Sequence, residues 1–166
     1  MANTTPKPWA DAAIGVVALA LLAWGWHGRA DPALDPHGWP GYLLGLGGAL
    51  MMLLVLAYSL RKRVQRGRWS VGWWYHAHVL LGLFGPVAVL VHARFGWRSI
   101  NAGFALIAML LVVGSGLIAR YALPWAHRSA HAWARSLTGM WHYLHVPLFI
   151  VLGLAVLVHV FMAHAY

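Results

Sequence analysis

Residues 78–92, with the sequence HVLLGLFGPVAVLVH, decide how this chain folds. Only apolar and small residues separate the two histidines, which are fourteen positions apart. On an α-helix, that spacing leaves an angular drift of about 40° and a rise of about 21 Å. The imidazoles of His78 and His92 therefore lie on one stripe of one helix, near the two sides of a hydrocarbon core about 30 Å thick.

Residues 145–159, HVPLFIVLGLAVLVH, repeat this pattern with His145 and His159 at the ends. Two helices with matched stripes can hold two flat cofactors, one above the other. The pattern predicts two b-type haems, with His78, His92, His145 and His159 as the metal ligands. The alternative is that each histidine forms a hydrogen bond with a neighbouring helix.

The composition is that of a membrane protein. The chain is 61% hydrophobic and 9% charged, with a mean hydropathy of +0.67, whereas soluble domains are about 25% charged. The absence of cysteine excludes thiolate-bound iron–sulfur clusters, covalently attached haem and disulfides. No dinucleotide-binding glycine motif occurs.

Five apolar stretches are long enough to cross a bilayer. They predict an all-α membrane protein, a five-helix transmembrane bundle in one domain over residues 1–166, with two stacked haems between the third and fifth helices. The predicted helices span about 10–26, 41–60, 72–93, 100–121 and 140–163. The first is interpreted as a retained helix rather than a signal peptide, because no clear cleavage site precedes Arg29.

The basic residues are distributed unevenly between the two sides of these spans. Nine lie on the side of the amino terminus: Lys7, Arg61, Lys62, Arg63, Arg66, Arg68, Arg120, Arg128 and Arg135. Three lie on the other side: Arg29, Arg94 and Arg98. The positive-inside rule then places the amino terminus in the cytoplasm. Because these bases occupy short loops between spans, we expect them to set topology and not to bind nucleic acid.

The same topology predicts how the histidines pair. The third and fifth helices are separated by one span, so they run parallel. His78 then lies level with His145 on the cytoplasmic side, and His92 lies level with His159 on the outer side.

Acidic residues are too few for a proton pathway. Asp11, Asp31 and Asp35 are the only carboxylates, and all lie near span ends or in a loop. A carboxylate proton relay through the membrane is therefore excluded, and electron movement is favoured.

Some residues near the histidines could contact the cofactors. Gly82 and Gly85 lie on the face of the third helix that carries the histidines, where a macrocycle edge needs clearance, although ordinary helix packing explains them equally well. Arg94, Arg68 and Arg135 could neutralise haem propionates, and topology-setting charge explains them as well.

Four further histidines are not expected to be haem ligands. His76 does not lie on the same helix stripe as His92, and His142 does not lie on the same stripe as His159. Both are predicted to be interfacial, with a role near the propionates as the alternative. His127 and His131 have the i, i+4 spacing of a zinc site, but no third ligand is evident. Residues 124–138 instead predict an amphipathic segment in the membrane interface.

The chain resembles bacterial di-haem b-type cytochromes, and most of all small members related to the ferric reductase-like transmembrane family. The motifs that carry the resemblance are WWYHAH at 73–78, VH at 91–92, GLIARY at 116–121, WHYLHVP at 141–147 and VH at 158–159. They fall within about 72–163. In that family, two histidines on each of two helices hold stacked haems that carry electrons across the membrane.

The resemblance implies a protein of the bacterial inner membrane, but it is incomplete. Five spans instead of six, and the lack of an attached flavin domain, put intrinsic NADPH oxidation in doubt. Cytochrome b subunits of quinol-oxidising complexes share the four-histidine arrangement and remain a rival analogy.

Three functions follow as expectations. The first is an electron-transfer subunit of a larger membrane complex, with an external redox partner protein or quinone and no catalytic residue of its own. The second is a self-contained oxidoreductase that reacts with quinone, oxygen species or ferric chelate. The third is a non-redox structural helix bundle whose histidines only form hydrogen bonds.

Overall fold

The computed structural model describes residues 8–64, 70–122, 124 and 132–165. This part of the chain is helical and contains no strand. Five helical segments of this part are long and apolar enough to cross a membrane, which confirms the prediction of an all-α chain with five candidate spans. The chain divides into two units, residues 1–96 and residues 97–166.

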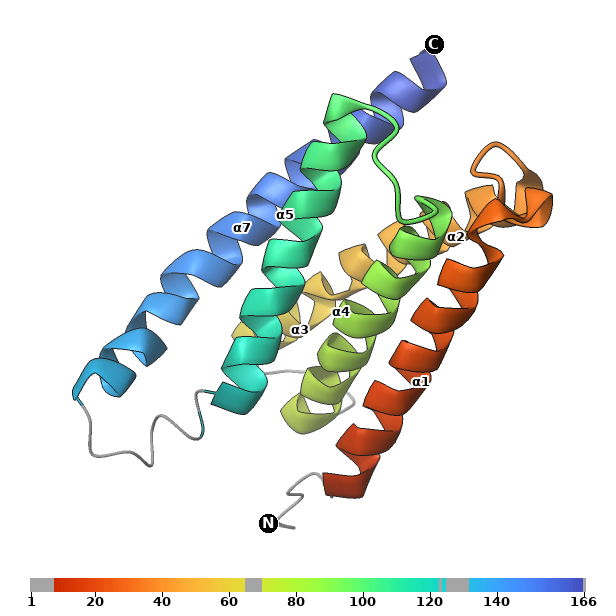
Figure 1. The fold of residues 1–166 in the computed structure, drawn as a ribbon. Coiled ribbons are helices and arrows are strands. Elements are labelled where there is room, and N and C mark those ends of the chain that lie inside the picture. The colour runs from red at the N-terminus through yellow and green to blue at the C-terminus, as the bar shows by residue number, and fades with distance from the viewer. Residues whose placement is uncertain (1–7, 65–69, 123, 125–131, 166) are drawn as a thin grey trace. The chain divides into compact units, whose positions relative to one another are not determined.

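The described residues of the first unit form four α-helices and two short 3-10 turns (Figure 1). In chain order they are α1 (Pro8–His27), η1 (Gly28–Ala30), η2 (Pro32–Leu34), α2 (Trp39–Leu54), α3 (Leu56–Arg63) and α4 (Val71–His92). Helix α4 packs mainly against α2, and it also contacts α3 and α1. It therefore forms the centre of this unit.

Helix α4 begins and ends at defined local signals. The Ser70 hydroxyl caps its amino terminus by accepting a hydrogen bond from the Trp73 backbone N–H at 3.2 Å. The helix continues through Pro86 and ends at His92. Arg94 and Phe95 follow with φ angles of 51° and 56°, a left-handed conformation that cannot continue the helix. These bounds lie within one residue of the predicted 72–93.

Helices α2 and α4 approach closely because small residues face each other. A Cβ atom on Gly48 would lie 2.8 Å from the carbonyl oxygen of Gly85, and one on Gly85 would lie 3.1 Å from the carbonyl oxygen of Gly48. Small residues at such a crossing allow the van der Waals contact that holds membrane helices together. Gly85 therefore contributes to helix packing, the alternative considered for it from the sequence.

The predicted helix at 41–60 is two helices, α2 and α3, interrupted at Val55. No proline or glycine occurs between residues 51 and 60 to explain the interruption. The imidazole of His78 lies 3.2 Å from the Val55 carbonyl oxygen. A side chain that competes for a helix carbonyl is a known cause of such breaks.

The second unit contains α5 (Ile100–Leu117), the π-helical turn η3 (Ile118–Ala122) and α7 (Ala132–Ala165). Helices α5 and α7 lie side by side and run in opposite directions (Figure 1). The hydroxyl of Ser99 caps α5 by accepting from the Ala102 N–H at 3.1 Å. The buried side chains of this unit include Ala108, Met109, Leu152 and Ala155.

Helix α7 is longer than the predicted span at 140–163. Residues 132–138, predicted to belong to an interfacial segment, are part of α7. Residues 125–131, which include His127 and His131, lie outside the described residues. The sequence therefore located the apolar part of α7 but not its amino-terminal extension.

The outer faces of the helices carry large apolar side chains. Exposed examples are Leu19 on α1, Leu154 on α7 and Phe161 on α7, and no polar side chain of the described residues is buried. This distribution suits helices surrounded by lipid, because lipid tails solvate apolar side chains as well as a protein core does.

Candidate functional site

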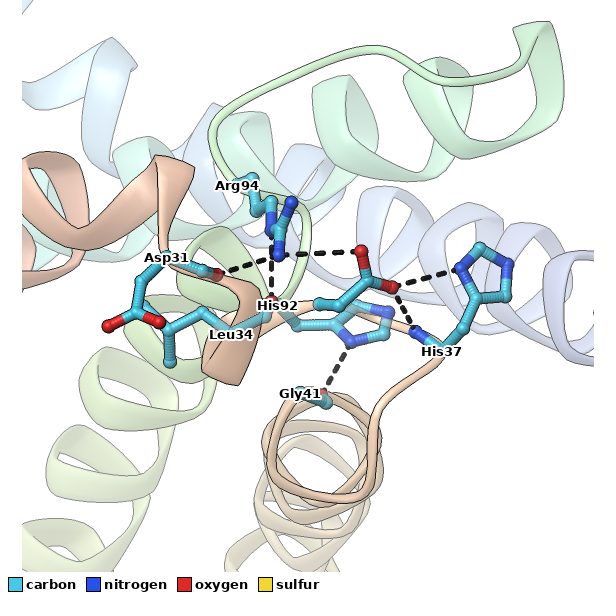
Figure 2. Close-up of polar contacts among 7 residues, drawn as sticks. Asp31, Leu34, His37, Gly41, His92 and Arg94 are labelled. Atoms are coloured by element: carbon cyan, nitrogen blue, oxygen red, sulfur yellow. Dashed lines mark hydrogen bonds and ion pairs between the residues drawn. The ribbon is translucent and has the colours of Figure 1, made fainter.

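His92, the last residue of α4, is tied to the start of α2. Its Nδ1 lies 2.8 Å from the carbonyl oxygen of Gly41 (Figure 2). A carbonyl can only accept, so Nδ1 carries the proton and the lone pair of the neutral ring is on Nε2. A Cβ on Gly45 would lie 2.8 Å from Nδ1 and 2.9 Å from Cε1 of this imidazole. The ring therefore occupies space that the absence of a side chain at Gly45 provides.

His78 has the same arrangement near the other end of α4. Its Nδ1 lies 3.2 Å from the Val55 carbonyl oxygen, so the proton is again on Nδ1. The ring also packs against Tyr58 of α3, with centroids 5.2 Å apart and an interplanar angle of 53°. His78 is half-buried.

His145 of α7 is held by two contacts within the second unit. Its Nδ1 lies 2.7 Å from the Ser115 hydroxyl oxygen, and that hydroxyl donates to the Val112 carbonyl at 2.7 Å. Because the serine proton is used in this way, Nδ1 of the histidine is the donor. The indole of Trp141 stacks on the imidazole at 5.0 Å and 22°. His145 is therefore a third histidine with its proton on Nδ1.

His159 completes the predicted set. It is half-buried on α7, one turn after the buried Ala155. His145 and His159 thus lie on one helix, as the repeated spacing predicts. The facing of His78 with His145, and of His92 with His159, stays a prediction.

Histidines outside the predicted set have a different environment. The Nδ1 atoms of His76 and His164 lie 2.7 and 2.8 Å from the carbonyls of Gly72 and Val160, four residues earlier in their own helices. Both are exposed. His78, His92 and His145 instead contact an acceptor outside their own helix. The side chain of His142 lies outside the description.

Arg94, one of the predicted propionate partners, has several partners within the first unit. Its Nε donates to the Leu34 carbonyl at 3.1 Å, and its Nη2 donates to the Asp31 carbonyl at 2.8 Å (Figure 2). The same Nη2 lies 3.4 Å from the Asp35 carboxylate, which also lies 3.2 Å from Nδ1 of His37. Arg94 therefore ties the end of α4 to the connection between α1 and α2.

The other predicted contact residues are placed only in part. A Cβ on Gly82 would have its nearest neighbour, Val55 Cγ2, at 4.0 Å, an ordinary van der Waals contact. Arg135 lies on α7, but its side chain is outside the description, as is the whole of Arg68. Propionate contacts at these arginines stay a prediction. Within the described ranges, no three His, Cys, Asp or Glu side chains form a group that could hold a metal ion.

Sequence reasoning missed the partners of the histidines. Ser115 could have been found, because it is an isolated hydroxyl in the apolar span at 100–121. Trp141, whose Nε1 donates to the Ser115 carbonyl at 2.8 Å, lies in the motif at 141–147, but the motif does not indicate this contact. The carbonyls of Gly41 and Val55 have no signal in the sequence, because every residue carries one.

Comparison of the chain with known protein families, curated proteins and solved structures gave no match.

Proposed function

We propose that this protein is a di-haem b-type cytochrome that carries electrons across a membrane. One observation carries the proposal: His78, His92 and His145 each donate Nδ1–H to an acceptor outside their own helix. Histidines that ligate metals are almost always held in this way, because the hydrogen bond fixes the ring orientation and the tautomer. The lone pair is then on Nε2, the nitrogen that would bind iron.

The donor set fits haem b. The helices offer neutral imidazoles, and the chain has no cysteine that could provide a thiolate ligand. When bound, a haem with two imidazole ligands supplies a one-electron iron couple. The protein residues orient the imidazoles and keep water away with apolar helix faces. A histidine in a membrane span is costly, so four of them at this spacing favour a functional role.

The proposed ligands form two sets, His78 with His145 and His92 with His159. Gly82, which is less tightly packed than Gly85, is proposed to lie near a macrocycle edge. Gly85 is not needed for this role, because it packs against α2.

The electron donor and acceptor are proposed to lie outside these helices. The described residues lie almost entirely in helices, and no nucleotide-binding motif occurs in the sequence. A redox partner protein or a quinone would exchange electrons at the two membrane faces. The self-contained oxidoreductase is the second candidate, but no group of the described residues is identified as a substrate pocket.

The first test is the haem content of the purified protein. Pyridine haemochrome and protein assays are expected to give about two haems b per chain, with the sharp spectrum of low-spin iron. Correctly inserted but colourless protein would instead support the structural helix bundle. Adding a quinol separates the other two functions, because reduction without a partner protein favours the self-contained oxidoreductase.

We further propose that the protein lies in a bacterial inner membrane with its amino terminus in the cytoplasm. Because the chain lacks cysteine, single cysteines at positions 66 and 98 can report the topology without background. An impermeant thiol reagent added to intact cells is expected to label position 98 and not position 66, owing to the uneven distribution of bases. Labelling of both from outside contradicts the proposed topology.

A further inference from the structure

Ser115 of α5 contacts α7 through two of its groups. Its hydroxyl oxygen accepts from His145 Nδ1 at 2.7 Å, and its carbonyl oxygen accepts from Trp141 Nε1 at 2.8 Å. The ring of Trp141 in turn stacks on the imidazole of His145. One residue thus fixes the ring of His145 by a direct hydrogen bond and by an aromatic neighbour.

We propose that Ser115 is a positioning residue that holds the His145 imidazole for its metal and sets the redox potential of that site. This inference rests on the proposed function. Hydrogen bonds run in one direction from His145 through the Ser115 hydroxyl to the Val112 carbonyl. An imidazole that donates Nδ1–H to such an acceptor is more basic at Nε2. A more basic ligand stabilises ferric iron and lowers the potential.

The hydrogen bonds described above for His78 and His92 differ from that of His145 in the kind of acceptor. His78 and His92 donate to the backbone carbonyls of Val55 and Gly41. A point substitution leaves a backbone carbonyl in place, whereas one substitution at Ser115 removes the acceptor of His145. The hydroxyl that accepts from His145 can therefore be removed or restored by a single substitution at Ser115.

Ser115→Ala isolates the hydroxyl, because the backbone carbonyl that binds Trp141 remains. In a redox titration of the purified protein, one of the two midpoint potentials is expected to become more positive, and the other to stay unchanged. Ser115→Thr keeps a hydroxyl and is expected to restore the wild-type potential. Ser99→Ala is the matched control, because Ser99 caps the same helix through its hydroxyl without contacting a histidine.

A second measurement does not depend on haem. In the haem-free protein labelled with ¹⁵N-histidine, the His145 resonances are expected to show the Nδ1–H tautomer. This preference is expected to weaken in Ser115→Ala and to persist in Ser115→Thr. The resonances of His145 are identified by their loss in His145→Ala.

The outcomes separate this inference from the proposed function. Wild-type protein without haem overturns both. Two haems in the wild type, together with unchanged potentials and an unchanged His145 tautomer in Ser115→Ala, overturn the role of Ser115 alone. Loss of one haem in the alanine variant, restored by threonine, supports positioning. Equal loss of both haems in the alanine and threonine variants assigns Ser115 to helix packing and overturns the inference.

Discussion

Alanine at His78 or at His145 is expected to remove or convert one haem, and alanine at His92 or at His159 is expected to affect the other. Each substitution would remove one of the two proposed histidine ligands of one iron. The second site lies about 21 Å along the helix and keeps its ligands. Optical and EPR spectra should therefore place the four variants in two classes, with two variants in each.

His76→Ala is the matched control, because His76 lies on the same helix and its Nδ1 is bonded to the Gly72 carbonyl of its own turn. We expect it to retain both haems, as we do for His142→Ala. Electron passage across membrane vesicles should fail in all four ligand variants, because one remaining site leaves most of the bilayer to be crossed. A variant of His76 that loses a haem, with both retained in His78→Ala, contradicts the assignment.

The predictable part of this fold is the part that depends on local sequence. A span requires only a sufficient length of apolar residues, so composition alone located five of them. Ser70 and Ser99 cap the helices that follow them, because a serine hydroxyl can accept a hydrogen bond from a backbone N–H three residues later in the chain. The stripe His78–His92 followed from helical periodicity, which is also local.

The features that sequence missed depend on contacts between helices. The acceptors of His78, His92 and His145 are 23, 51 and 30 positions away along the chain. No periodicity within one helix can identify a partner on another. The break at Val55 has the same origin, since its carbonyl is shared with His78.

Gly45→Ala is expected to disturb the site of His92 strongly, although residue 45 is not a proposed ligand. The new Cβ would lie 2.8 Å from Nδ1 of His92, closer than real side chains approach. Moving α2 away from α4 would relieve this contact only by opening the close packing of Gly48 against Gly85 of α4. The imidazole must therefore shift and lose its hydrogen bond to the Gly41 carbonyl.

The expected size of the effect of Gly45→Ala follows from two consequences of the shift of the imidazole. Overpacking of a tight site costs about 1–3 kcal/mol of folding free energy, and loss of the hydrogen bond that orients a metal ligand costs about 10- to 100-fold in metal affinity. Haem titration of the haem-free protein should show one weakened site and one unchanged site. Gly47→Ala, on the same helix, should bind both haems like the wild type, because a Cβ there meets no atom within 4 Å.

A double variant tests whether the effect passes through the imidazole. If Gly45→Ala acts by displacing His92, then adding it to His92→Ala should cost little further stability, because the ring it would strike is gone. The two substitutions should therefore be non-additive in thermal or denaturant unfolding. Additive losses would mean that the alanine disturbs helix packing elsewhere, and the glycine would then have no role in holding the ligand. Non-additivity together with selective loss of one haem would link a missing side chain on α2 to the orientation of His92 on α4.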